Sequence, residues 1–235
     1  MKGQHWFFPF PLLMGFLLMG CQTMARQGPF LYPVPPKDEV VDNYHGVQVA
    51  DPYRWLEDGD DARTRKWVDI QREIAEGYLA TPERATIKAR LKELANYPRY
   101  GLPHLEGGRL FYTKNDGLQD QDVLYVQDSL KGEARVLLDP NGLSEDGTVA
   151  VTATSVSDDG RLLAYSLSTS GSDWQEIHLR NVDTGEDLPD RLQWCKFSSV
   201  AWSPDGSGFF YNRYPDPATV PPEDRHSYNR VYWHK

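Results

Sequence analysis

The chain has 235 residues, of which 40% are hydrophobic and 12% aromatic, and its formal net charge is −9 at pH 7. These values are those of a globular protein with one large domain or two small ones, and the aromatic content favours strands over a helical bundle. The acidic charge argues against nucleic acid as a partner, and two cysteines, Cys21 and Cys195, are too few to predict a disulfide framework or a zinc site.

Residues 1–21 predict an export signal. A lysine near the start is followed by an apolar run from Trp6 to Met19, and a small residue precedes Cys21. The run is shorter than the ~20 residues that span a bilayer, so a permanent transmembrane helix is the poorer interpretation. Its end resembles the lipobox of bacterial lipoproteins, which predicts lipidation at Cys21; a plain signal peptide and a misassigned start are the alternatives. We therefore expect an exported protein, either periplasmic or anchored to the outer membrane of a bacterium through a lipid on Cys21.

Residues 22–38 are rich in proline and predict an extended tether. Residues 39–100 carry the patterns of helices. Asp51 is expected to cap a short helical turn that starts at Pro52. After the aspartates at positions 58, 60 and 61, a longer helix is expected, with one apolar stripe formed by Trp67, Ile70, Ile74 and Tyr78.

A second helix is expected to begin at a cap on Thr81 and to stop at Pro98. After Pro98 the hydrophobic period changes from that of helices to that of strands, and turn signals separate short apolar runs. Within residues 101–235 these runs predict nine strands: Arg109–Lys114, Val123–Gln127, Ala134–Leu138, Ala150–Val156, Leu162–Leu167, Glu176–Asn181, Trp194–Trp202, Phe209–Arg213 and Val231–His234.

One phrase recurs among these strands, a Ser-x-Asp-Gly turn followed by an apolar run that ends in tyrosine. It occupies residues 157–165 and 203–211, with its glycines 46 residues apart, and a weaker copy begins at Gly107. A recurrence of about 40 to 50 residues is typical of β-propeller blades, although Asp-Gly before a strand is also an ordinary hairpin signal. The predicted fold is mainly β: an incomplete propeller of about two and a half blades, preceded by a two-helix segment.

No candidate catalytic group is more convincing than its structural alternative. The chain has no Gly-x-Ser-x-Gly nucleophile elbow, and Ser172 and Ser207 lie in turn sequences. Its histidines occur singly, without the spacing of a metal site, and the aspartates at 158, 159 and 205 suit turn geometry. The sequence therefore predicts no catalytic residue, no metal site and no cofactor in this chain.

Long motifs nevertheless occur in order along the chain. Among them are Asn43-Tyr44-His45-Gly46, Asp51-Pro52-Tyr53-Arg54-Trp55-Leu56-Glu57-Asp58, Ser168-Thr169-Ser170-Gly171-Ser172-Asp173-Trp174 and Phe197-Ser198-Ser199-Val200-Ala201-Trp202. Together they resemble the N-terminal third of the prolyl oligopeptidases, a family of serine peptidases, over about residues 31–235. The resemblance implies a seven-bladed propeller that caps an α/β-hydrolase domain, with residues 39–100 belonging to the hydrolase side.

The same resemblance implies a serine endopeptidase that cleaves short proline-containing peptides after proline. The family's catalytic serine, aspartate and histidine lie in a C-terminal hydrolase portion that is absent from these 235 residues, so we expect the chain alone to be inactive. The missing hydrolase domain is then an expected partner. The alternative is a lipid-anchored propeller that serves as a binding module without peptidase activity, although open sheet edges argue against it.

Two substrate-binding residues are also implied by the resemblance. Phe197 corresponds to a propeller phenylalanine that reaches into the substrate cavity, and Asp173 to an acidic residue that orients the family's substrate-binding arginine. Their structural alternatives are a buried strand position and a turn position. Trp174 is expected to pack between sheets. Cys195, which precedes Phe197 by two residues on one predicted strand, is expected to share its face and to be buried and unreactive.

Overall fold

The computed structural model describes residues 32–235. They divide into two compact units, one ending at Arg84 and the other running from Ala85 to Lys235. The predicted export signal, the lipidation at Cys21 and the start of the predicted tether lie outside the described residues, so these remain predictions.

The first unit contains a β-hairpin that the sequence patterns did not predict. Strands β1 (Val41–Tyr44) and β2 (Val47–Ala50) pair antiparallel and lead to a short 3₁₀ helix, η1 (Arg54–Glu57). The predicted cap at Asp51 is wrong, because the residue before η1 is Tyr53 and no side chain caps it. The Asp51 carboxylate instead accepts a hydrogen bond from Arg54 Nε at 2.5 Å, since the guanidinium offers a charged donor in place of a backbone N–H.

Helix α1 (Ala62–Leu79) follows η1 and packs against it. Asp61 caps α1 by accepting a hydrogen bond from the backbone N–H of Arg63 at 2.6 Å. The hydroxyl of Thr64 donates to the Trp55 carbonyl at 2.7 Å, and the Trp67 ring meets the Trp55 ring edge-on, with centroids 6.4 Å apart. The predicted stripe is thus half-buried from Trp67 to Ile74 and exposed only at its end.

Helix α2 (Pro82–Ala95) begins where the sequence predicted. The Thr81 hydroxyl accepts a hydrogen bond from the Arg84 N–H at 3.2 Å, and Pro82 occupies the first helical position, where its missing N–H costs nothing. The cap on Thr81 is therefore confirmed.

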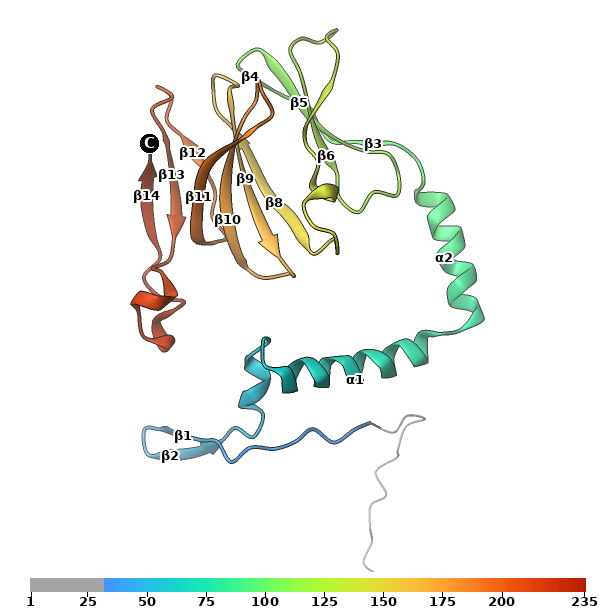
Figure 1. The fold of residues 1–235 in the computed structure, drawn as a ribbon, viewed down its shortest axis with the longest axis vertical. Coiled ribbons are helices and arrows are strands. Elements are labelled where there is room, and N and C mark those ends of the chain that lie inside the picture. Colours follow the sequence, from blue (N-terminus) through green and yellow to red (C-terminus); the bar gives the residue numbers. More distant parts are fainter. Residues whose placement is uncertain (1–31) are drawn as a thin grey trace, which may run out of the picture. The chain divides into compact units, whose positions relative to one another are not determined.

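The second unit contains three antiparallel sheets that lie side by side in chain order (Figure 1). Blade 1 comprises β3 (Arg99–Tyr100), β4 (His104–Glu106), β5 (Arg109–Asn115), β6 (Val123–Gln127) and β7 (Arg135–Leu138). Blade 2 comprises β8 (Val149–Val156), β9 (Leu162–Thr169), β10 (Trp174–Asn181) and β11 (Asp187–Lys196). Partial blade 3 comprises β12 (Ala201–Trp202), β13 (Phe209–Arg213) and β14 (Arg230–His234). Two blades and part of a third confirm the predicted incomplete propeller.

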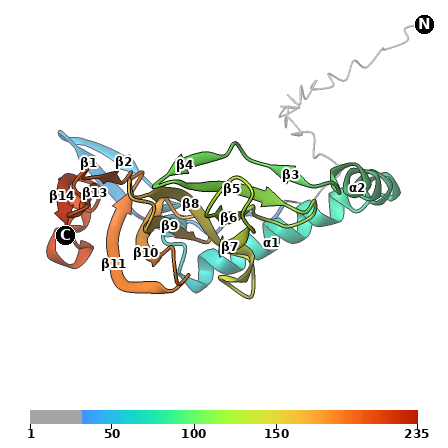
Figure 2. The same ribbon diagram turned by 90° about the horizontal axis from the view of Figure 1, so that it is seen from above.

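Apolar side chains fill the two spaces between neighbouring sheets. The three sheets are also adjacent when the molecule is seen from above (Figure 2). Strand β9 lies in the middle and has both faces buried: Leu163 and Tyr165 pack against blade 1, whereas Ala164 packs toward partial blade 3. The alternation of side chains along a strand explains this division. Phe111 fills the first space and Phe209 the second, and both are almost completely buried.

The repeated turn phrase occupies the same point of each blade. It joins the first two strands of blade 2 and of partial blade 3, with Gly160 at φ +71° and Gly206 at φ +70°. In each turn a serine hydroxyl donates to the aspartate two residues later, at 2.7 Å for Ser157 and 2.5 Å for Ser203. The phrase is therefore a hairpin turn that also marks the blade period.

One predicted strand, Trp194–Trp202, is wrong. Strand β11 starts at Asp187 and ends at Lys196, and β12 starts only at Ala201. Phe197 interrupts the run because its backbone has φ +50°, a left-handed conformation that departs from the extended backbone of a regular strand.

Candidate functional site

The connection from β11 to β12 carries the exposed phenylalanine that the sequence singled out. The Phe197 side chain is 72% exposed, so the alternative of a strand residue buried between blades is wrong. Exposure of a large apolar ring on a backbone of unfavourable conformation is costly, and such positions concentrate at functional sites.

A β-bulge just before this connection sets the direction of the chain. Strand β11 pairs Leu192 with Ile177 but Cys195 with Gln175, so β11 has one more residue than β10 between these pairs. Trp194 lies in the bulge with φ +64°, and its carbonyl accepts a hydrogen bond from the Tyr214 N–H at 2.9 Å.

Cys195 and Phe197 do not share a face, which corrects the expectation from strand alternation. Cys195 is completely buried, whereas Phe197 lies beyond the end of β11 and points its ring to the surface. Alternation holds only within a continuous strand, and the left-handed residue ends it. Burial raises the pKa of the Cys195 thiol to about 11, as expected for a buried and unreactive cysteine.

A single ammonium group connects the two predicted recognition residues. Lys196 Nζ lies 3.2 Å from Asp173 Oδ2 and 5.6 Å from the centroid of the Phe197 ring. The same Nζ lies 5.7 Å from the Trp174 ring centroid. The structure thus brings Asp173 and Phe197 around Lys196, a residue that the sequence reasoning missed although it precedes Phe197 directly.

Trp174 forms the fixed side of this cluster. Its ring stacks on His226 at 5.5 Å with planes 22° apart, and it meets the Tyr214 ring edge-on at 5.5 Å. Tyr214 and His226 belong to the connection between β13 and β14, so Trp174 packs between blade 2 and partial blade 3 as predicted. A cavity of about 210 Å³ adjoins the ring, lined by Leu167, Thr169, Ser172, Trp174, Gln175, Glu176, Gln193 and Trp194.

Two histidines of the described residues pair with carboxylates. His178 Nε2 lies 3.4 Å from Glu176 Oε2, and His234 Nε2 lies 2.9 Å from Asp190 Oδ1. Within residues 32–235, no group of three or more histidine, cysteine, aspartate or glutamate side chains could hold a metal ion. In the same part of the chain, no helix is both long and apolar enough to cross a membrane.

Fold and site together define a protein of the β-propeller class, with an exposed aromatic residue where one blade passes to the next. Residues 32–235 match the family described as "Prolyl oligopeptidase, N-terminal beta-propeller domain". The chain belongs to the prolyl oligopeptidase family and contains its N-terminal propeller region.

Two curated relatives illustrate the match. The prolyl endopeptidase of Elizabethkingia meningoseptica is 40% identical over 209 residues, which cover 87% of this chain and 29% of that protein. The prolyl endopeptidase of Dictyostelium discoideum is 30% identical over 259 residues, covering 88% of this chain and 34% of that protein. The chain spans about a third of the length of the relatives it matches.

Solved structures agree in fold. A prolyl endopeptidase from a study of inter-domain dynamics in catalysis and specificity superposes with a TM-score of 0.76 at 36% identity, covering 87% of this chain and 30% of that one. Prolyl oligopeptidase B from Galerina marginata, solved with a 35mer hydrolysis and macrocyclization substrate, gives a TM-score of 0.67 at 30% identity, covering 87% and 32%. These relatives act on peptides.

Proposed function

We propose that this chain is the N-terminal propeller portion of an exported serine endopeptidase that cleaves short peptides after proline. The observation that carries the proposal is the match of residues 32–235 to the propeller region of the prolyl oligopeptidases. Because the whole relatives are about three times longer, the activity is assigned to the complete enzyme and not to these 235 residues.

Within this proposal, Phe197 contacts an apolar side chain of the bound peptide. Its ring is 72% exposed, and contact with an apolar group would remove part of that surface from water. Asp173 orients the family's substrate-binding arginine through a charge-assisted hydrogen bond. Its present ion pair with Lys196 leaves its side chain 56% exposed, so the carboxylate remains accessible to a second cation.

The isolated chain is proposed to be inactive toward peptides. Acyl transfer by a serine requires a base within hydrogen-bond reach and an oxyanion hole beside it, and the sequence has no Gly-x-Ser-x-Gly elbow to supply the nucleophile. A lipid on Cys21 would hold the enzyme at a bacterial membrane, in the periplasm or on the outer membrane.

The gene downstream of codon 235 tests the proposal most directly. We expect a reading frame of several hundred residues that contains Gly-x-Ser-x-Gly, and we expect the enzyme made from the joined frames to hydrolyse a chromogenic peptide after proline. The purified 235-residue chain is the matched control and should release no chromophore. An unrelated gene directly downstream would contradict the proposal and favour the lipid-anchored binding module. Mass spectrometry of the mature N-terminus would decide whether Cys21 is lipidated.

A further inference from the structure

We propose that Lys196 is a positioning residue that holds the Phe197 ring in its exposed orientation. The inference rests on the proposed function, because it assigns to Lys196 an indirect part in peptide recognition. In the described part of the chain, the Phe197 ring interacts with the Lys196 ammonium and with no other cation or aromatic ring.

The lysine is itself held on two sides. Its side chain is only 20% exposed, and its ammonium pairs with the Asp173 carboxylate while lying over the Trp174 ring. A partly desolvated cation interacts more strongly with aromatic rings than a fully hydrated one. A third ring, that of Phe197, shares the same ammonium. Asp173 and Trp174 hold the Lys196 ammonium in place, and the ammonium in turn restrains the orientation of the Phe197 ring.

Backbone pairing gives this arrangement a rigid base. Lys196 lies opposite Trp174 in the antiparallel register of β10 and β11, so their contact is a cross-strand pair. Trp174 is in turn fixed by stacking on His226. The backbone of Phe197, by contrast, leaves the strand at φ +50°, and its side chain lacks the neighbours that a core residue would have. Without Lys196 the ring would sample other rotamers, since little else restrains it.

A fluorine label on the ring tests the inference independently of peptide binding. The chain would carry 4-fluorophenylalanine at position 197, and its ¹⁹F resonance would be compared between the wild-type sequence, Lys196→Met and Lys196→Arg. We expect the methionine variant to shift and broaden the resonance, because the cation is lost while an apolar stem remains. The arginine variant should restore the wild-type signal. Lys114→Met is the matched control, because Lys114 also pairs with an aspartate at 2.7 Å and lies over a tyrosine ring at 5.9 Å.

Titration of the complete enzyme made from the joined reading frames, carrying the same substitutions, with a non-hydrolysable proline peptide that bears an apolar residue before proline separates the positioning role of Lys196 from the peptide-binding role of Phe197. We expect Lys196→Met to weaken binding about five-fold, the size of one cation–π contact, and Lys114→Met to leave it unchanged. A ¹⁹F shift with no peptide binding by any sample would support positioning and contradict the peptide role of Phe197. A resonance that Lys196→Met leaves unchanged would overturn the inference. Should that variant fail to fold by circular dichroism, Asp173→Asn removes the ion pair at a more exposed position and should move the resonance in the same direction.

Discussion

Gly107 and Gly160 meet backbone to backbone where blade 1 adjoins blade 2. A Cβ on Gly107 would lie 2.0 Å from the Asp159 carbonyl oxygen, and one on Gly160 would lie 2.7 Å from the Glu106 carbonyl oxygen. Arg109 stabilises this contact between the two turns by donating a hydrogen bond to the Gly160 carbonyl at 3.1 Å. Two copies of the repeated turn thus contact each other, and glycine is required for the approach as well as for the turn.

Alanine substitutions at Gly107 and Gly108 should separate the requirement for a positive φ from the requirement for close backbone approach. Gly107 and Gly108 both have positive φ, +56° and +80°, but a Cβ on Gly108 would have no atom within 4 Å. We expect Gly108→Ala to lower the free energy of unfolding by about 1–2 kcal/mol, the cost of a left-handed alanine. Gly107→Ala adds a backbone clash and should cost about 3 kcal/mol or more. Urea denaturation followed by tryptophan fluorescence measures both, and equal losses would contradict the contact between turns.

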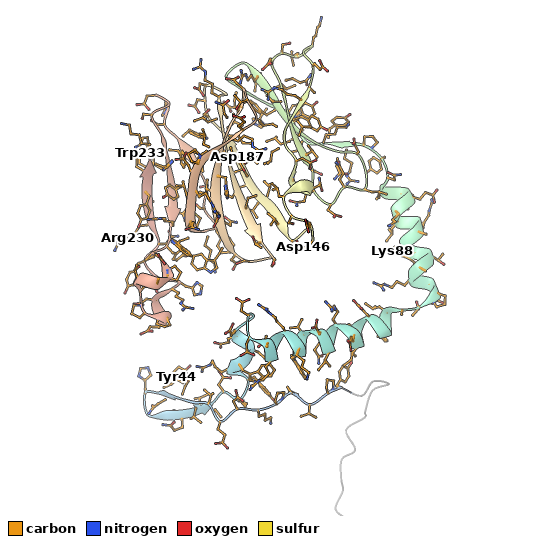
Figure 3. All side chains as sticks on the ribbon, viewed as in Figure 1. Tyr44, Lys88, Asp146, Asp187, Arg230 and Trp233 are labelled. Carbon is orange, nitrogen blue, oxygen red and sulfur yellow. The ribbon has the colours of Figure 1, made fainter. Side chains whose placement is uncertain are left out.

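Arg180 provides a second link between blades 1 and 2. Its guanidinium donates to both carboxylate oxygens of Asp187 at 2.7 and 2.9 Å, and to the Leu137 carbonyl of β7 at 2.8 Å. The Asp187 side chain is labelled among the sheets in Figure 3. We expect Arg180→Met to lower the free energy of unfolding by about 2 kcal/mol, because Asp187 loses its charged partner. Arg191→Met is the control: Arg191 pairs with Glu176 on the same blade but is 62% exposed, so little change is expected. A similar loss of unfolding free energy in both variants would mean that the link between blades adds no more stability than the exposed ion pair of Arg191 within one blade.

The turn carboxylates make stability depend on pH in the acid range. Hydrogen bonds from the Ser203 and Ser207 hydroxyls and the Ser207 N–H lower the pKa of Asp205 from 3.8 to about 2. Because the folded pKa lies below the unfolded one, the contribution of this carboxylate is present above about pH 4 and is lost as the pH falls toward 2. Thermal unfolding between pH 2 and 7 should be less pH-dependent in Asp205→Asn than in the wild type. A profile in Asp205→Asn as steep as that of the wild type would reject this assignment.

Phe197→Gly should remove the ring without loss of stability. Glycine adopts φ +50° freely and the ring is mostly exposed, so the free energy of unfolding should stay within about 1 kcal/mol of the wild type or rise. Phe210→Gly is the comparison, since Phe210 is 50% exposed on β13 and packs on the Trp233 ring at 4.7 Å. That variant should be destabilised by about 1–2 kcal/mol. Equal destabilisation of the two variants would indicate that the Phe197 ring stabilises the fold by packing and does not serve to recognise a peptide.

The sequence by itself determined the architecture of this protein. The glycines of the repeated turn predicted the blade period because only glycine occupies such positive-φ positions without strain, and the Thr81–Pro82 pair predicted the start of α2 for an equally local reason. Ordered motifs such as residues 168–174 and 197–202 identified the family, which the match over residues 32–235 confirms.

Only the tertiary structure decided the geometry around Phe197. Strand alternation placed Cys195 and Phe197 on one face, but Phe197 leaves the strand with a left-handed backbone. The bulge at Trp194 just before it accepts a hydrogen bond from the Tyr214 N–H, a group remote in sequence. The role of Lys196 depends likewise on register, because its neighbour Trp174 is reached only across the β10–β11 pair. Local patterns predict where a strand occurs, whereas contacts between distant segments decide where it ends and what its last side chains touch.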